Sequence, residues 1–321
     1  ANWRWGWQVA VFINLAGALW TIERLTAGPV TIGNTLIAAI ACAFAVYAFG
    51  TGWVLIPIGF ALLIFQRAHR SRQGLAVLAI WSALTGLLFW HFSLALNGTA
   101  AAYTTSSMPN VLDVGTWLGL VHYALNFVAS PIVRFERDSS LVAMMIGFTV
   151  LGWSIWTLRV AQKEPIGRAI VPFLALVAFS LGSGLLTAIG RLEAFGVQHA
   201  FVSRYISFGS FFWIAVFALA ILAIAKTSHK SHKRTFAVLG LLFVLKLGNI
   251  PSVVQKSVKI SNEVSQASQQ LAAAYPDVLA DTYSVLHNPV QNIEPQLDIL
   301  SEYQVSLFAH APDSEDDEPV K

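Results

Sequence analysis

The chain has 321 residues, of which 56% are hydrophobic and 12% are charged, and its formal net charge is +3. Residues 1–250 carry seventeen Lys or Arg and six Asp or Glu, whereas residues 251–321 carry three and eleven. A chain this apolar is not a soluble globular protein, and we expect no nucleic-acid partner for so small a net charge.

Long stretches without charge define the predicted helices of the first 250 residues. No charged residue lies between Arg24 and Arg67, or between Arg72 and Asp113. A helix needs roughly 20 apolar residues to cross a bilayer, and a soluble helix would need a polar face that these stretches lack. The pattern predicts an all-α, polytopic transmembrane bundle of about eight or nine spans. The eight spans are expected at about 5–22, 30–49, 52–66, 75–96, 140–158, 169–190, 205–225 and 236–250.

Three short basic loops orient the predicted bundle. They are Gln66–Gly74, Arg159–Arg168 and Lys226–Thr235, and the positive-inside rule places all of them in the cytoplasm. The segments Asn97–Asp138 and Arg191–Arg204, together with the acidic tail, then lie outside. In a bacterium this describes a multi-pass protein of the inner membrane with its C-terminal tail on the periplasmic side.

The uncharged run Val114–Val133 conflicts with that orientation if it is a span. Together with 75–96 and 140–158 it would give three crossings between two loops on the same side. His122, Asn126 and Pro131 also make it the least membrane-like of the three. We therefore expect it to be an interfacial or re-entrant helix. The alternative is a ninth span with one basic loop on the other side.

The C-terminal region has a different composition, so the chain divides into three parts. Residues 1–250 form the transmembrane domain, residues 251–310 a helical extracytoplasmic tail, and residues 311–321 a disordered acidic end. Within the tail, Ile260, Val264, Ala267 and Leu271 recur at helical spacing and predict an amphipathic helix over about 252–273.

The candidate site lies between two predicted spans, in the segment that starts at Arg191 and ends at Tyr205. Two arginines beside a short outside loop can grip a phosphate, because a guanidinium binds phosphate oxygens in a bidentate way. The alternative is that both arginines only extend to the lipid headgroups. The sequence shows no metal-ligand spacing or phosphate-binding glycine loop, and we expect no metal. The candidate phosphate-binding residues are Arg191, Glu193, Gln198, His199, Ser203, Arg204 and Tyr205.

Several short motifs are spread over nearly the whole chain. They are Asn2-Trp3, Trp5-Gly6 and Trp7-Gln8; Thr51-Gly52 with Leu55 and Pro57; Gly190-Arg191, Phe195-Gly196, Ala200, Ser203-Arg204-Tyr205 and Ser207; and Tyr275-Pro276-Asp277 with Ser306-Leu307-Phe308. Together they resemble large bacterial polytopic membrane proteins that look like glycosyltransferases of the GT-C class, which use lipid-linked sugars. The first motif is similar to that family's "ENWLWGFQ" stretch, with Ala1 where the family usually has Glu. The second is similar to its "NGLLLWP" segment.

The resemblance implies a membrane-embedded glycosyltransferase, or the C-terminal part of one, that takes a sugar from a polyprenyl phosphate. In such proteins the catalytic carboxylate lies in an outside loop upstream of the Trp-rich segment. The catalytic residues are therefore not identified in this chain, and neither is a cofactor other than the sugar donor. The alternative is a non-catalytic membrane subunit that packs against partner subunits and lipids. A transporter is a third reading, to which only Asn14 and Lys246 point as polar residues within spans.

Overall fold

The computed structural model describes residues 8–66, 68–103, 113–131, 167–224 and 250–274, and the single residues 152 and 240. Every secondary-structure element within these ranges is a helix, which confirms the all-α fold. The chain divides into two compact units, Asn2–Leu247 and Gly248–Lys321. Apart from the single positions 152, 240 and 250, the predicted spans 140–158 and 236–250 lie outside the described residues.

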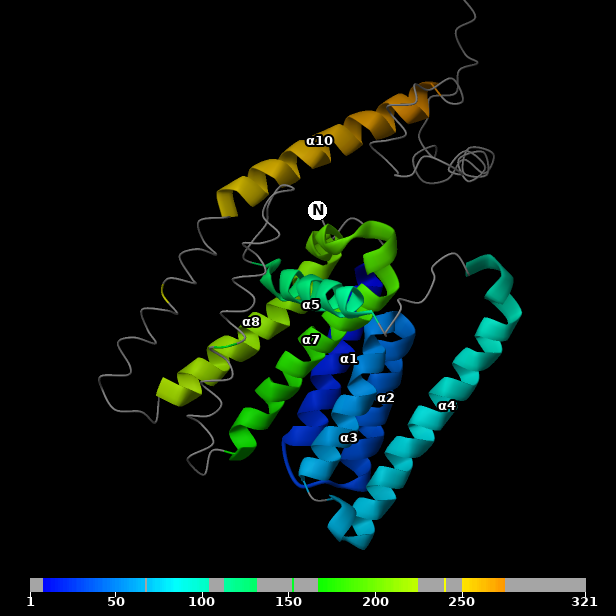
Figure 1. The fold of residues 1–321 in the computed structure, drawn as a ribbon, viewed down its shortest axis with the longest axis vertical. Coiled ribbons are helices and arrows are strands. Elements are labelled where there is room, and N and C mark those ends of the chain that lie inside the picture. Colours follow the sequence, from blue (N-terminus) through cyan, green and yellow to red (C-terminus); the bar gives the residue numbers. More distant parts are fainter. Residues whose placement is uncertain are drawn as a thin grey trace, which may run out of the picture. The chain divides into compact units, whose positions relative to one another are not determined.

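Within the described ranges the first unit contains seven α-helices and three 3-10 helices (Figure 1). They are α1 (Gln8–Thr26), α2 (Ile32–Ala48), η2 (Gly50–Val54), α3 (Leu55–Phe65), η3 (Ala68–Arg70), α4 (Arg72–Tyr103), α5 (Val114–Ala129), α7 (Gly167–Phe195), η4 (Val197–Phe201) and α8 (Ser203–Ile224). Among the described helices, four are long and apolar enough to cross a membrane: α1, α4, α7 and α8. The shorter apolar helices are Ile32–Ala48, Gly50–Phe65 and Val114–Ala129. The structure thus supports a membrane protein, while eight or nine spans remain a prediction.

The helices α1, α2, α3, α4, α7 and α8 run between two ends of this unit (Figure 1). Figure 1 shows the start of α4, the start of α7 and the end of α8 toward one end. In the sequence, each of these helix ends adjoins one of the three basic loops. We call this the basic-loop end. The other end carries η4, between α7 and α8, and we call it the arginine end because Arg191 and Arg204 flank η4.

Small residues let α1 and α2 pack closely. A side chain added at Gly17 would lie 2.7 Å from the carbonyl oxygen of Ala41 and 3.0 Å from the Cβ of Ala45. Helix pairs in membranes associate through such small residues, because lipid offers little hydrophobic driving force between them. The Gly and Ala residues on these faces therefore explain why α1 and α2 form a tight pair.

A buried polar corner joins this pair to η2. The side-chain amide of Asn14 donates to the carbonyls of Ala45 (2.7 Å) and Phe49 (3.0 Å), and Thr51 donates to Asn14 Oδ1 (3.3 Å). Both Asn14 and Thr51 are buried. A Cβ at Gly52 would lie 2.5 Å from the backbone of Ala45, so only glycine permits this approach. The Thr51-Gly52 motif therefore has a structural role.

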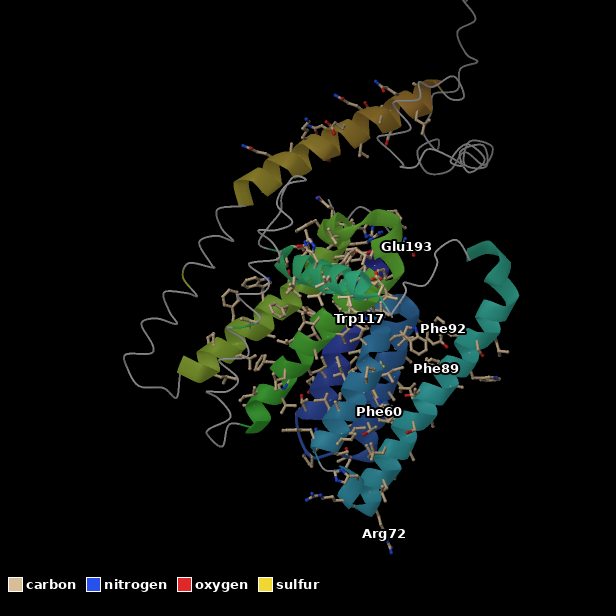
Figure 2. All side chains as sticks on the ribbon, viewed as in Figure 1. Phe60, Arg72, Phe89, Phe92, Trp117 and Glu193 are labelled. Carbon is tan, nitrogen blue, oxygen red and sulfur yellow. The ribbon has the colours of Figure 1, made fainter. Side chains whose placement is uncertain are left out.

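The helix α4 packs on α2 and α3 but is mostly exposed. Trp81 is fully buried over Gly59 and donates its indole N–H to the carbonyl of Ile56 (3.1 Å). Further along α4, Phe89 and Phe92 contact the ring of Trp53 from η2, on the side that faces the bundle (Figure 2). From Arg72 to Phe92 a helix rises about 30 Å, the thickness of the hydrocarbon layer. The aromatic rings thus lie one membrane thickness from the basic loop.

Three helices continue several residues beyond their predicted spans, and α7 is one of them, because it ends at Phe195 and not at 190. The helix α1 continues past Ile22 to Thr26 and contains Glu23 and Arg24, which form a salt bridge (3.1 Å). The helix α4 continues past position 96 to Tyr103. Hydropathy marks where the apolar segment ends, whereas the backbone hydrogen bonds of a helix continue into polar surroundings as long as the residues favour it.

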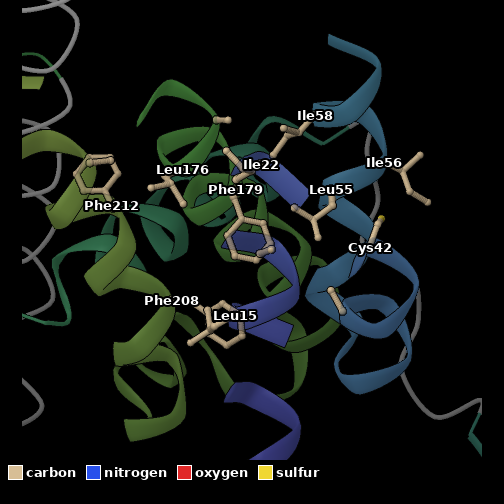
Figure 3. Packing of buried hydrophobic residues seen from close by; sticks show 14 of the residues in the cluster. Leu15, Ile22, Cys42, Leu55, Ile56, Ile58, Leu176, Phe179, Phe208 and Phe212 are labelled. Atoms are coloured by element: carbon tan, nitrogen blue, oxygen red, sulfur yellow. The ribbon is translucent and has the colours of Figure 1, made fainter. Parts of the chain in front are cut away.

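The core of the first unit lies where α1, α3, α7 and α8 meet. Phe179 of α7 and Phe208 of α8 are fully buried, with ring centroids 6.2 Å apart, and Figure 3 shows them with Leu15 of α1. Ser180 donates to the carbonyl of Phe208 (2.8 Å) and adds a polar link between α7 and α8. This core fixes the two helices that carry the candidate site.

The second unit contains α10 (Ile250–Ala274), close to the amphipathic helix predicted over 252–273. Ala267 and Leu271, two of the predicted apolar positions, are buried, whereas Val254 and Val258 are exposed. Lys259 and Glu263 form an i,i+4 pair at 3.8 Å on its surface. The predicted boundaries at 310 and 311 lie outside the described residues.

Candidate functional site

A glycine sets the turn at which the candidate site is built. The helix α7 ends at Phe195, and Gly196 follows with a φ of 70°, a left-handed conformation that favours glycine. Its N–H donates to the carbonyl of Leu192 (2.8 Å), which closes the last turn of α7. The chain then forms η4 and enters α8 at Ser203, so the residues between α7 and α8 are held in a short, defined connection.

The helix α5 packs against α7, η4 and α8 and forms one wall of this region. Asp113 caps its first turn by accepting from the N–H groups of Gly115 and Thr116, each at 3.1 Å. Near its other end, Asn126 donates to the carbonyl of Val197 in η4 (3.3 Å). The helix therefore begins at an exposed aspartate and continues into the interior.

The C-terminal end of α5 is buried inside the bundle. Two contacts join α5 to α7: Gly119 of α5 meets Leu192 of α7, and Phe127 of α5 meets Gly184 of α7. Gly184 lies eight residues before Leu192. These eight residues correspond to about 12 Å along α7. The carbonyl of Val128 accepts from the Trp213 indole (2.7 Å). Buried helix ends need such partners, so this end is built to lie within the protein.

His199 lies at the centre of the candidate site. Its Nδ1 is 3.1 Å from the hydroxyl oxygen of Tyr123 on α5, and the Tyr123 side chain is fully buried. The imidazole stacks on the ring of Phe195 with centroids 4.6 Å apart, and the buried Tyr205 contacts it edge-on at 5.6 Å. Residues from α5, α7 and α8 thus fix the position and orientation of this imidazole.

Each of the two arginines lies over an aromatic ring that contacts His199. The guanidinium of Arg191 is 5.5 Å from the centroid of Phe195, and that of Arg204 is 5.1 Å from the centroid of Tyr205. Cations bind the negative faces of aromatic rings, and this contact holds the planar guanidinium groups in place. We call this group of residues the arginine cluster. Its members are Arg191, His199 and Arg204 and the rings of Tyr123, Phe195 and Tyr205.

The electrostatic environment keeps His199 neutral near pH 7. Burial is the main cause that lowers the pKa of His199 to about 4, and the positive charges of Arg204 and Arg191 lower it further. Both guanidinium groups are therefore close enough to the imidazole to oppose its protonation. The cluster has two permanent positive charges and one neutral group that can become the third.

The structure brings four of the predicted site residues together: Arg191, His199, Arg204 and Tyr205. Arg191 is exposed and Arg204 is partly buried. The remaining three are near the cluster in sequence. Glu193 is exposed on α7 (Figure 2), Gln198 is exposed in η4, and Ser203 is the first residue of α8.

Tyr123 and Phe195 belong to the cluster but were not predicted. Phe195 appears in the sequence only as part of the Phe195-Gly196 motif, and its ring gives no sign of a partner. Tyr123 is 76 positions from His199. The polar residues His122 and Asn126 within an apolar run were the only signal that α5 has a special role.

No group of three or more His, Cys, Asp or Glu that could hold a metal ion occurs in the part of the chain that the structure describes. Comparisons with protein-family models, with curated proteins and with solved structures find no match to this chain.

Proposed function

We propose that the arginine cluster binds the phosphate group of a lipid-linked sugar, in a membrane-embedded glycosyltransferase of the GT-C kind or its C-terminal part. The observation that carries the proposal is the placement of two guanidinium groups, each fixed over an aromatic ring, around a single imidazole. Arginines that only reach for lipid headgroups need no such support.

The chemistry of sugar transfer suits this arrangement. When a sugar leaves a polyprenyl phosphate, negative charge develops on the phosphate oxygen that remains. Positive groups held in position beforehand stabilise such charge most effectively, because they need no reorganisation during the reaction. Arg191 and Arg204 supply these charges, and the buried ring of Tyr205 holds one side of the site. The residue that activates the acceptor is not identified.

The position of the cluster also fits a lipid-borne substrate. It lies at the junction of α7 and α8, at the end of the bundle opposite the basic-loop end. With the basic loops in the cytoplasm, this is the outer face of the membrane. A carrier whose chain lies in the bilayer would present its phosphate at this level.

Arginine-to-lysine substitutions test the proposal. Lysine keeps the charge but lacks the planar fork, so a bidentate phosphate contact is lost while a headgroup contact is kept. We expect Arg204→Lys to weaken binding of a short polyprenyl phosphate to the purified chain, and Arg191→Lys to do so less, because Arg191 is the more exposed of the two. Loss of one such donor costs on the order of 10²–10³ in rate in enzymes.

The matched control is Arg72→Lys, at an exposed arginine at the basic-loop end (Figure 2). It should leave binding unchanged. Unchanged affinity in both cluster variants would remove the phosphate site, and it would favour the alternative of a non-catalytic membrane subunit.

A further inference from the structure

We infer that His199 is a third phosphate-binding group of the arginine cluster, which takes up a proton when the anion binds, and that Tyr123 is its positioning residue. This role rests on the phosphate site proposed above and goes beyond it, because it assigns the proton and names a residue on α5. The ligand class is a phosphate ester with one fixed negative charge.

Within the part of the chain that the structure describes, the His199 imidazole hydrogen-bonds through Nδ1 alone, which leaves Nε2 for a ligand. Tyr123 hydrogen-bonds to Nδ1, and the stacked ring of Phe195 and the edge contact of Tyr205 prevent the imidazole from turning away. The two nitrogens of an imidazole point in different directions, so the orientation set at Nδ1 also fixes Nε2. Nε2 can therefore donate to an anion held by the same pair of arginines.

The charges around His199 explain why proton uptake accompanies binding. Burial opposes a positive charge on the imidazole, and Arg204 from α8 and Arg191 from α7 oppose it further. Among the residues that the structure describes, the other titratable groups that contact the imidazole are Tyr123 from α5 and Tyr205 from α8. His122 on α5 and the exposed Glu193 on α7 are close in sequence to these groups.

An anion between the two guanidinium groups offsets their charge and favours the protonated imidazole. Linkage is reciprocal, so an anion that promotes protonation also binds more tightly when protons are available. The affinity for the anion should therefore rise as the pH falls from the pKa that His199 has in the bound state toward the lower pKa that it has in the free state. The rise is at most about tenfold per pH unit for one proton.

The test uses the purified full-length chain in detergent and two probes, dihexyl phosphate and dimethyl phosphate. As dialkyl esters, both probes carry one negative charge and have no second ionisable proton, so any pH dependence of binding near neutral pH belongs to the protein. We expect tighter binding at lower pH, with net proton uptake measured by calorimetry in buffers of different ionisation enthalpy. Tighter binding of the dihexyl ester would assign the site to a lipid phosphate, and equal binding would assign it to a soluble phosphate ester.

The variants separate His199 from the rest of the molecule. His199→Gln should still bind the probe, because both arginines remain, but without pH dependence and without proton uptake. Tyr123→Phe should keep proton uptake and bind more weakly, since the imidazole loses its hydrogen bond. His69→Gln, at an exposed histidine at the basic-loop end, is the control and should behave as wild type.

Two results would overturn the role of His199. One is pH-independent binding by the wild-type chain, a measurement that needs no variant to fold. The other is proton uptake that persists in His199→Gln. Either leaves the phosphate site itself intact, whereas failure of both probes to bind would remove the proposed function as well.

Discussion

Polar residues within the apolar helices have specific partners, and this changes how the sequence is interpreted at the residue scale. Asn14, which pointed to a transporter when read from the sequence, donates to two carbonyls at the end of α2 and accepts from Thr51. Backbone carbonyls at a helix end need partners when they are buried. Asn14 therefore adds a second donor to carbonyls that also accept from the backbone N–H groups of Phe49 and Gly52, and its position within a span needs no transport role.

Asn14→Ala should destabilise the bundle measurably. It removes the amide bonds to the carbonyls of Ala45 and Phe49, which keep their backbone donors, and it leaves the buried Thr51 hydroxyl without its acceptor, which costs about 1–3 kcal/mol for an unsatisfied group. We expect a lower midpoint of thermal unfolding for the purified protein in detergent. Ser93→Ala, which removes an exposed hydroxyl on α4, is the control and should leave the midpoint nearly unchanged. Equal midpoints for both variants would show that the Asn14 corner adds no stability.

The candidate site was only partly predictable from its residues. Arg191 and Arg204 stood out because they flank a short connection between two uncharged stretches. Their aromatic supports did not, because a ring in an apolar chain has many possible partners. Tyr123 was beyond sequence reasoning, since its contact with His199 exists only through the way α5 packs onto η4.

At the element scale, α5 is the helix that the sequence described least completely. The charge pattern gave it two readings, a non-crossing helix or a ninth span. The structure shows a helix of 16 residues whose C-terminal end, with Phe127 and Val128, is fully buried against α7 and α8. A helix of this length rises about 24 Å, less than the hydrocarbon layer. These features favour a re-entrant helix. A helix can end at membrane depth only where protein surrounds its end, and the end of α5 is buried in this way.

Trp213→Phe tests how α5 is anchored. The change removes the indole N–H that binds the carbonyl of Val128 and keeps most of the ring. We expect a loss of about 1–3 kcal/mol for the buried carbonyl, seen as a lower unfolding midpoint in detergent. Binding of dihexyl phosphate should also weaken, because Tyr123 lies on the same helix.

Trp90→Phe is the matched control for this substitution. Trp90 is 61% exposed on α4, so its replacement should change neither the midpoint nor probe binding. A Trp213→Phe protein with wild-type stability and binding would mean that α5 is held by its other contacts alone.

At the scale of the whole molecule, composition determined the fold class and left the packing open. The absence of charge over whole segments of the sequence predicts apolar helices whatever their partners are. Which helices meet depends on small residues such as Gly17 and Gly52, whose role becomes visible only when the opposing backbone is known. The sequence therefore predicted the bundle and most of its helices, but neither the close α1–α2 pair nor the burial of the C-terminal end of α5 against α7 and α8.

The last prediction concerns the two ends of the bundle. Gly28, in the turn between α1 and α2, and Gln73, at the start of α4, are both exposed near the basic-loop end, whereas Gln198 is exposed in η4. In a Cys42→Ala background, a single cysteine at 28 or 73 should resist an impermeant thiol reagent in intact cells, and one at 198 should react. After permeabilisation all three should react, which is the control for accessibility. Because basic loops are retained in the cytoplasm, this pattern is required for an outward-facing arginine cluster. Labelling at 73 with protection at 198 would invert the bundle and place the phosphate site on the cytoplasmic face.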